Sequence, residues 1–408
     1  MSIMAGNDLL NKRKILKQLY FKNSLSCADL SKLIKKSFPL TTRMLNELIN
    51  EGFVIEKGFA PSSGGRRPLT YSLKPGILYV VAVAMDQFIT RMVMMDLQRG
   101  YVSEIEKFEL PLPRNPLALS QLVEKIDHFI INSGIEKERI AGVGIGMPGF
   151  VDSKKGLNYS FLETDGKSIT ESLEGIIGVP VFIDNDSRLI ALAELRFGKA
   201  RKKKDAMIVN IGWGIGLGLV LNGELFKGHN VFAGEFSHIP LFSNNKLCSC
   251  GKSGCLETEA SLLVVIEKAI SGLNKGEVSV LKELLNENID KTAETIIKAA
   301  EKGDKFAVEL LSEAGYSIGR GLAILIHLIN PEIIILSGRG SLGGKLWLAP
   351  IQQALNEHCI PRLAINTDVE ISGLGHEAEL IGAAALVMEN FEHFEPVLHQ
   401  VKRNELSV

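Results

Sequence analysis

Long apolar runs are missing from this sequence of 408 residues, although 46% of its residues are hydrophobic. The longest runs, residues 77–85 and 323–329, fall well short of the roughly 18 to 20 residues that a membrane span needs. No apolar signal core is found at the start, where Asn7, Asp8 and the basic run 12–14 lie. We therefore expect a cytoplasmic protein, and the length predicts two or three domains.

Cysteine is also scarce. Of the five cysteines, Cys248, Cys250 and Cys255 lie within eight residues of one another. An odd, clustered set without a signal segment does not fit a disulfide framework and indicates thiolate ligands of a metal in a reducing compartment. Cys27 and Cys359 lie outside the cluster and are expected to be small buried apolar side chains.

Net charge is nearly absent, at −1, but its distribution is uneven. Residues 1–74 carry 13 Lys and Arg against 5 Asp and Glu, a net charge of +8, and the remainder carries 33 against 42, a net charge of −9. A basic segment on an acidic protein is typical of a module that faces nucleic acid, and also of a solvated basic helical surface. The charge alone does not distinguish these two interpretations, so the sequence motifs have to be considered.

Residues 1–74 show the pattern of three helices. Apolar residues at helical spacing predict a first helix up to about Phe21, and Ser26 with Asp29 three residues later is a cap signal for a second. A break at residues 37–39 precedes a third helix that stops near Gly52. Two short helices across a tight turn are a helix-turn-helix candidate. The third helix would then read DNA with outward polar residues, namely Thr41, Thr42, Arg43 and Asn46.

A hairpin is predicted next, with strands at residues 53–55 and 69–71 around a Gly/Ser-rich loop. The loop ends in Arg66 and Arg67, which could enter a minor groove or neutralise phosphates, whereas the alternative is a solvated turn. Helices, hairpin and charge together favour a winged helix-turn-helix DNA-binding domain over residues 1–74.

From residue 77 the sequence alternates apolar strands with amphipathic helices, which indicates an α/β fold. Residues 80–85 and 92–97 predict a hairpin with Asp86 at its turn. Six motifs follow in order: GIGMPG at 144–149, DND at 184–186, GWGIGLG at 212–218, GEFSH at 234–238, the cysteine cluster ending in Glu257, and NPE at 330–332. In this order they resemble the ROK family of bacterial repressors and sugar kinases, over about residues 8–390.

The resemblance implies a two-lobed actin/hexokinase-like, or ribonuclease H-like, α/β domain at residues 77–390, preceded by the winged helix-turn-helix. Lobe one would comprise about residues 77–185 plus 376–390, and lobe two about 186–375. Residues 391–408 would form a C-terminal tail.

The resemblance also implies a sugar site. Sugar binding needs convergent carboxylates and amides, because each ring hydroxyl both donates and accepts a hydrogen bond. In kinases of the family the aspartate matching Asp186 is the general base; the alternative is that Asp186 and Glu235 only cap helices. Ser237 stands where the family usually has glycine, so an unusual sugar preference is expected. The implied contacts are Asn158, Asn185, Asp186, Glu235, His238 and Glu257.

A zinc site is predicted from the cysteine cluster, with His238 as the fourth ligand beside Cys248, Cys250 and Cys255. Such a Cys3His set suits tetrahedral Zn²⁺ with no open position, which indicates a structural metal. The metal would fix the loop that carries Glu257 and hold His238 beside the sugar.

The phosphate loops depart from those of the family's kinases. Their first loop reads Asp-x-Gly-Gly-Thr, whereas Phe88 and Ile89 replace both glycines here and would block the approach of a phosphate. In the second loop, Trp213 occupies a position usually held by a small hydroxyl residue. Loss of phosphotransfer is therefore expected.

The overall prediction is a sugar-responsive transcriptional regulator, in the first instance a repressor, with zinc, a sugar or phosphosugar effector and operator DNA as partners. A homodimer or homotetramer would match a palindromic operator. Because Asp186 is intact, an ATP-dependent sugar kinase that also binds DNA is the alternative. A third hypothesis is a sugar-binding module whose helical head docks on a protein.

Overall fold

The computed structural model describes residues 2–60, 67–162, 164, 166–284 and 289–393. It divides into two compact units, Met1–Asn185 with Ala383–Val408, and Asp186–Gly382. Within the described residues no helix is both long and apolar enough to cross a membrane. The first apolar run includes β4 (Tyr79–Met85), and the second lies at the end of α11 (Lys305–Ile329).

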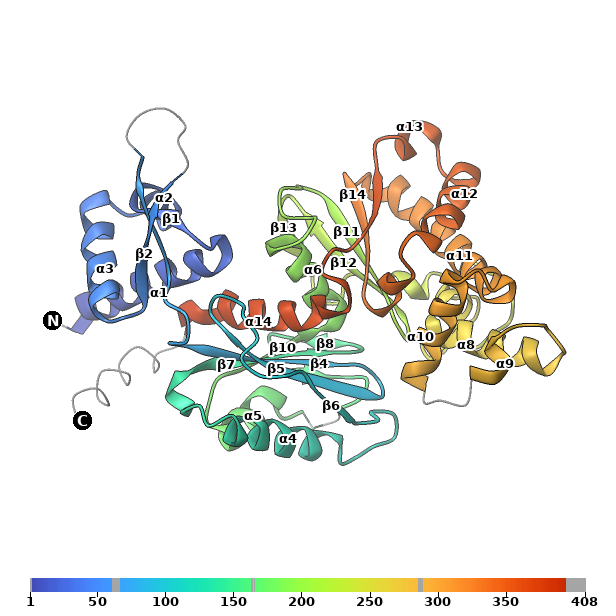
Figure 1. Cartoon of the computed structure of the whole chain (residues 1–408), viewed down its shortest axis with the longest axis horizontal. Helices are drawn as coiled ribbons and strands as arrows, with labels where there is room; N and C mark the ends of the chain where they lie inside the picture. The colour runs from blue at the N-terminus through green and yellow to red at the C-terminus, as the bar shows by residue number, and fades with distance from the viewer. Residues whose placement is uncertain (1, 61–66, 163, 165, 285–288, 394–408) are drawn as a thin grey trace. The chain divides into compact units, whose positions relative to one another are not determined.

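The first unit begins with three helices and a small antiparallel sheet, here called the head (residues 2–73; Figure 1). The sheet has the order β1-β3-β2. Leu16, Leu30 and Leu45 lie in the core of the head, and each is at most 1% exposed. The elements are α1 (Ser2–Lys22), β1 (Leu25–Ser26), α2 (Cys27–Leu33), α3 (Phe38–Asn50), β2 (Val54–Phe59) and β3 (Leu69–Leu73).

The predicted cap of the second helix is confirmed, since Ser26 Oγ accepts a hydrogen bond from the Asp29 N–H at 3.2 Å. The third helix begins earlier than predicted, because Pro39 lies in the first turn of α3 and does not break it. Proline is tolerated there because the first turn of a helix has no partner for its N–H groups. Strand β1 was not predicted, because it pairs with β3 through only two residues.

A five-stranded sheet with the order β10-β7-β4-β5-β6 forms the lobe that follows the head. The strand β4 pairs with β5 in the predicted antiparallel hairpin, and the pairs β4–β7 and β7–β10 are parallel. Its strands after β4 are β5 (Ile89–Asp96), β6 (Glu106–Glu109), β7 (Ile140–Met147) and β10 (Val181–Asn185); short elements are η1 (Lys137–Arg139), β8 (Val151–Asp152), β9 (Leu157–Asn158) and η5 (Phe391–His393).

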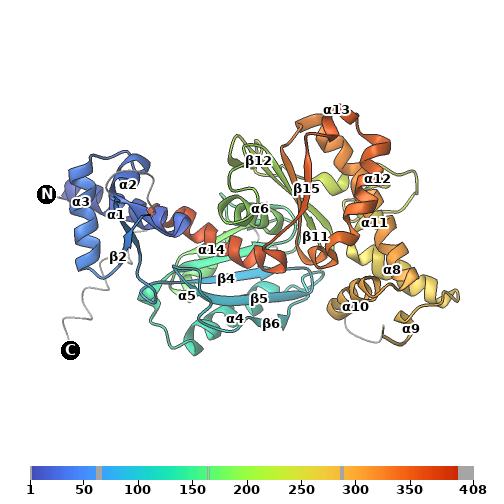
Figure 2. The ribbon, with the colours of Figure 1, turned by 45° about the horizontal axis from the view of Figure 1, so that its top comes forward.

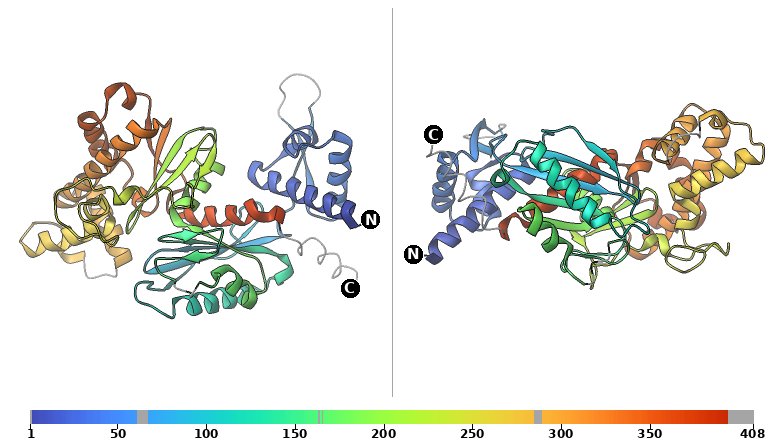
Figure 3. Two further views of the ribbon diagram at one scale, coloured as in Figure 1. Left: turned by 180° about the vertical axis from the view of Figure 1, so that it is seen from behind. Right: turned by 90° about the horizontal axis from the view of Figure 1, so that it is seen from below.

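Helices cover both faces of this sheet, which explains why β4 is apolar along its whole length (Figures 1 and 3). Helices α4 (Ala118–Asn132) and α5 (Ile169–Ile177) lie on one face, where Val81 and Val83 belong to the core. Helix α14 (Ala378–Asn390) lies on the other face. It approaches so closely that a Cβ on Gly144 would lie 2.0 Å from the Ala383 carbonyl oxygen.

The second unit contains a sheet with the order β13-β12-β11-β14-β15. Helix α6 packs on β11 and β12, and α8, α10, α11 and α12 are grouped together (Figure 2). Its elements are α6 (Asp186–Arg196), β11 (Ala206–Ile211), β12 (Ile215–Leu221), β13 (Glu224–Phe226), η2 (Phe236–His238), α7 (Glu257–Ala260), α8 (Leu262–Asn274), α9 (Leu281–Leu284), α10 (Ile289–Glu301), α11, β14 (Ile333–Ser337), η3 (Arg339–Leu346), α12 (Leu348–His358), α13 (Pro361–Ala364), β15 (Asp368–Ile371) and η4 (Gly375–Glu377).

Candidate functional site

The four predicted metal ligands come together in the second unit. The ligand atoms of His238, Cys248, Cys250 and Cys255 all lie within 4.8 Å of one another. Cys248 Sγ is 3.4 Å from His238 Nδ1, and the Sγ atoms of Cys250 and Cys255 are 3.6 Å apart. Tetrahedral coordination by sulfur at ~2.3 Å and nitrogen at ~2.0 Å places ligand atoms about 3.5 to 3.8 Å apart. These two distances are close to the tetrahedral values, and the cluster as a whole is compact enough to hold a metal ion.

The loop between His238 and Glu257 folds back on itself to make this cluster. Leu247 and Ser253 form an isolated bridge. Gly254 has φ +76°, and a Cβ there would lie 2.1 Å from the Phe242 carbonyl oxygen, so the turn requires glycine. Burial, followed by the neighbouring thiols, raises the pKa of Cys255 to about 12. A bound cation would favour the thiolate, so metal binding would release a proton.

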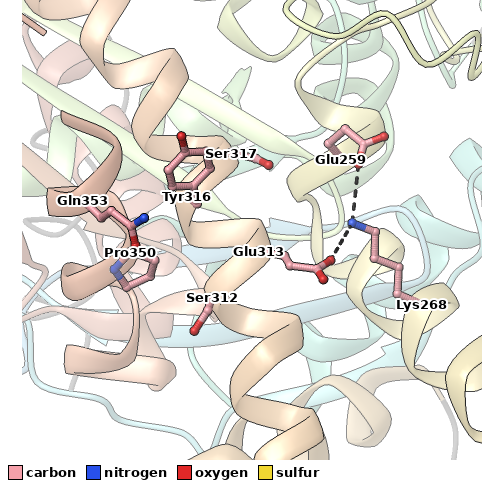
Figure 4. A pocket seen from close by; sticks show the side chains of 8 residues that line it. All are labelled: Glu259, Lys268, Ser312, Glu313, Tyr316, Ser317, Pro350 and Gln353. Carbon is pink, nitrogen blue, oxygen red and sulfur yellow. Dashed lines mark hydrogen bonds and ion pairs between the residues drawn. The ribbon is translucent and has the colours of Figure 1, made fainter. Parts of the chain in front are cut away.

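Ion pairs hold the outer side of this loop. Glu259 on α7 accepts from Lys246 Nζ at 3.1 Å and Lys268 Nζ at 3.4 Å, and Asn244 also donates to it. Lys268 also lies 3.2 Å from Glu313, and Figure 4 shows its ammonium group between the two carboxylates. Burial opposes the charge on Glu259, but the hydrogen bonds from Lys246 and Asn244 prevail and lower its pKa. These ion pairs connect the loop to α8 and α11. Glu259, Lys268 and Glu313 also line a pocket of about 490 Å³.

His238 links the metal cluster to the predicted sugar contacts. Its Nδ1 faces Cys248, and its Nε2 lies 3.7 Å from Glu235 Oε2. Metal-bound histidines generally direct their second ring nitrogen to a carboxylate or carbonyl, which fixes the ring. Desolvation raises the pKa of Glu235, while His238 and Arg188 act against that rise.

Glu257, at the start of α7, is held through one of its oxygens. Oε2 accepts a hydrogen bond from Ser237 Oγ at 3.2 Å and one from the Ile215 N–H at 3.4 Å. Within the described part of the chain Oε1 accepts none. The unusual Ser237 therefore touches a predicted sugar contact directly, and Glu257 is oriented with one oxygen committed to the protein.

Asn185 and Asp186 stand at the junction of β10 and α6. Asn185 Nδ2 donates to the Gly149 carbonyl at 3.1 Å. Asp186 accepts from the Ser187 N–H at 2.7 Å and from Asn210 Nδ2 at 3.2 Å. The first of these contacts is made to the next residue along the chain, and the second fixes the carboxylate from β11.

Asn158 is placed less favourably for the predicted sugar contact. It is 3% exposed. Its amide donates to the Pro148 carbonyl at 3.1 Å and accepts from the N–H groups of Ser160 at 2.9 Å and Phe161 at 3.1 Å. These bonds occupy the amide inside the protein, so Asn158 organises its loop and we leave it out of the proposed sugar contacts.

The predicted DNA-reading residues of α3 differ in exposure. Arg43 and Asn46 are exposed, and Arg43 forms ion pairs with Asp8 at 2.7 Å and Glu47 at 3.0 Å. Thr42 is half-buried. The expectation that Thr41 points outward is wrong: it is 0% exposed, because it precedes the core residue Leu45 by one helical turn.

In the hairpin, Arg67 is exposed. Arg66 and the loop residues 61–65 lie outside the described residues.

Side-chain contacts are formed at both predicted phosphate-loop positions. In the first unit, Asp86 Oδ1 accepts the N–H groups of both Phe88 and Ile89 at 2.8 Å, which closes the turn on itself. In the second unit, the guanidinium carbon of Arg339 lies 4.7 Å from the centroid of the Trp213 ring, and each side chain is 5% exposed. The side chains of Trp213 and Arg339 thus pack against each other at the predicted second loop.

Comparison with known proteins decides the family. Residues 92–390 match the model of the ROK family. The chain belongs to the ROK family. The xylose repressor of Caldicellulosiruptor bescii is 28% identical over 402 residues, 96% of this chain and 99% of its own. The transcriptional dual regulator NagC of Escherichia coli is 30% identical over 85% of this chain and 84% of its own.

A solved structure supports the same fold. A ROK family transcriptional regulator, described as a homolog of the E. coli MLC protein, aligns with a TM-score of 0.76 and 24% identity. The alignment covers 97% of this chain and 99% of the other. The predicted α/β ROK fold is therefore confirmed.

Three features of this ROK chain were missed from the sequence. Arg339 lies 126 residues after Trp213, so no local spacing signals their contact. Asn210 and Ser237 hold Asp186 and Glu257 through hydrogen bonds between different elements. The replacement of the usual glycine by Ser237 was visible, but its partner was not.

Proposed function

We propose that this ROK protein is a sugar-responsive transcriptional repressor with a zinc-stabilised sugar-binding domain and no phosphotransfer activity. One observation carries the proposal: the carboxylates and metal ligands expected of the sugar site are retained, while bulky residues replace the small residues of the predicted phosphate loops. Residues 1–74 would be the winged helix-turn-helix, residues 77–390 the sugar-binding ROK domain and residues 391–408 a tail.

DNA binding is proposed for the head. Support comes from its two short helices across a turn, its β2–β3 hairpin, the net charge of +8 over residues 1–74 and the exposed Arg43, Asn46 and Arg67. A recognition helix is held in the major groove by phosphate contacts and reads bases with its N-terminal residues. A homodimer or homotetramer would present two heads to a palindromic operator.

Zinc is the metal that the donor set favours. Three thiolates and an imidazole nitrogen suit a tetrahedral structural site, which would leave no position for a substrate. When bound, Zn²⁺ would supply a fixed charge and geometry to the loop that carries Glu257. His238 Nε2 would remain directed at Glu235, since Nδ1 is the nitrogen next to the cysteines.

The sugar is proposed to contact Asn185, Asp186, Glu235, His238 and Glu257. A sugar or phosphosugar can regulate DNA binding only if it binds one conformation of the protein more tightly than the other. We propose that effector binding lowers the affinity for operator DNA, in line with the repressors to which the chain is similar.

The first prediction tests the proposal as a whole. We expect one sugar or phosphosugar to raise the melting temperature by several degrees at about 100 times its Kd, because ligand binding at that level adds ~2.7 kcal/mol to stability. Mg-ATP should produce no shift, since Phe88, Ile89, Trp213 and Arg339 would obstruct the predicted phosphate loops. Differential scanning fluorimetry provides the measurement.

The alternative, a sugar kinase that also binds DNA, is kept because Asp186 holds the general-base position. Stabilisation by Mg-ATP together with formation of a sugar phosphate would overturn the repressor-only proposal. Failure of the effector to release DNA in a gel shift would overturn the regulatory part alone.

A second prediction concerns Ser237. In the Ser237→Gly variant Glu257 loses a hydrogen bond and can rotate, so we expect an affinity for the preferred sugar that is about 2- to 13-fold lower, the range given by one net hydrogen bond of about 0.5–1.5 kcal/mol. Isothermal titration calorimetry of several sugars should also show a smaller difference between them. Zinc content serves as the control and should not change. Identical sugar preferences in the variant would remove Ser237 from the site.

A further inference from the structure

An exposed aromatic side chain occupies the first residue of α3. Phe38 is 55% exposed, although large apolar side chains normally gain from burial. Its neighbours Ser37 and Pro39 are also exposed. The start of the third helix of the head therefore presents an apolar surface to solvent.

The two threonine hydroxyls expected to contact DNA at this end of the helix bond to the backbone of the head. Thr41 Oγ1 donates to the Ser37 carbonyl at 3.0 Å, and Thr42 Oγ1 donates to the Phe38 carbonyl at 2.9 Å. Both hydroxyls thus bond to the backbone of the turn that precedes them. The first turn of α3 offers a phenyl ring to a ligand, where the sequence pattern predicted two hydroxyls.

The position of Phe38 matches the part of a recognition helix that meets base edges. In helix-turn-helix proteins the N-terminal residues of this helix enter the major groove. The apolar group displayed there is the 5-methyl of thymine, which phenylalanine can contact. Arg43 and Asn46, one and two turns further on, provide the polar contacts that would hold the helix in the groove.

We propose that Phe38 reads thymine methyl groups in the major groove of the operator. The proposal rests on the DNA-binding function proposed above. It predicts that the operator carries thymine at the positions facing the start of α3, and that apolar contact with the methyl group makes up most of the discrimination there.

The test uses a substitution that removes only the methyl group. Duplexes are first enriched from a random-sequence library by the full-length wild-type protein. Each thymine of an enriched duplex is then replaced in turn by uracil, and affinities are measured by fluorescence anisotropy. At one or a few thymines per half-site we expect uracil to weaken wild-type binding about fourfold, the effect of losing one buried methyl-sized group.

Phe38→Ala should bind thymine and uracil duplexes equally at those positions, whereas Phe38→Leu should keep part of the preference. Phe226→Ala is the control, since it removes a phenyl ring of similar exposure, 44%, from β13 in the other unit. This variant should keep the full preference for thymine over uracil. Circular dichroism of Phe38→Ala checks that the head is folded.

Two results would overturn the proposal: a wild-type protein indifferent to uracil at every thymine, or an unchanged preference in Phe38→Ala. If no duplex is enriched at all, the DNA-binding function itself fails, which is a different outcome. If a protein partner, but no DNA, protects Phe38 from solvent, the head is a protein-docking module and the proposal also fails.

Discussion

Replacing Cys255 by serine should abolish metal binding and, with it, the response to sugar. Cys255 is 0% exposed and lies 3.6 Å from Cys250, and a serine hydroxyl is a poor ligand for zinc. Zinc per chain, measured by mass spectrometry, should fall from about one to near zero. Sugar affinity should fall by about 10- to 100-fold or more, because the metal would no longer hold His238 opposite Glu235.

Cys359→Ser is the matched control for this experiment. Cys359 is likewise buried, at 6% exposure, and lies outside the metal cluster. It should therefore retain both zinc and sugar binding. Should Cys255→Ser misfold, chelation of the wild-type protein followed by addition of Zn²⁺ provides the second measurement, in which sugar binding should be lost and then recovered. A zinc-free protein that binds sugar normally would separate the two sites and contradict the coupling.

This coupling depends on which nitrogen of His238 faces the metal ligands. With Nδ1 beside Cys248 and Nε2 beside Glu235, a rotation of the ring would disturb both contacts at once. Glu257 lies two residues after Cys255 and one side of its carboxylate is bonded to Ser237, so the same loop positions a second predicted sugar contact. Metal loss should therefore affect sugar binding more than any single hydrogen bond does.

Features that depend on residues close together in the chain were predictable from the sequence. Ser26 and Asp29 marked the start of α2 because a cap is made within four residues. His238 and the three cysteines were recognisable because few residue types bind zinc and the loop between them is short. Thr41 could have been placed correctly, since its spacing of four and seven residues from Leu45 and Leu48 puts it on the buried stripe.

Features that depend on distant contacts were not predictable in the same way. The stacking of Arg339 on Trp213 requires β11, β12 and β14 to lie in one sheet, which brings the loops after β11 and β14 together. The hydrogen bonds of Asn158 depend on the turn that follows β7. Family motifs identified Asn158 as a candidate contact by position, but only the surrounding backbone shows that its amide is already bonded.

Arg43→Ala should weaken operator binding by about 10- to 100-fold, the range expected when a side chain bonded to a base edge is lost. In the free protein Arg43 is paired with Asp8 and Glu47, so it must exchange these carboxylates for DNA. The variant Asp8→Asn should therefore strengthen DNA binding a few-fold.

Titrations at several salt concentrations show whether Arg43 contacts a phosphate or a base edge. Loss of a phosphate contact lowers the salt slope by about one with no change in sequence preference, whereas loss of a base contact relaxes the preference at one position. Arg201→Ala, in an exposed basic loop of the other unit, is the control and should behave as wild type. Equal affinities of Arg43→Ala and wild type would remove Arg43 from the proposed DNA contacts.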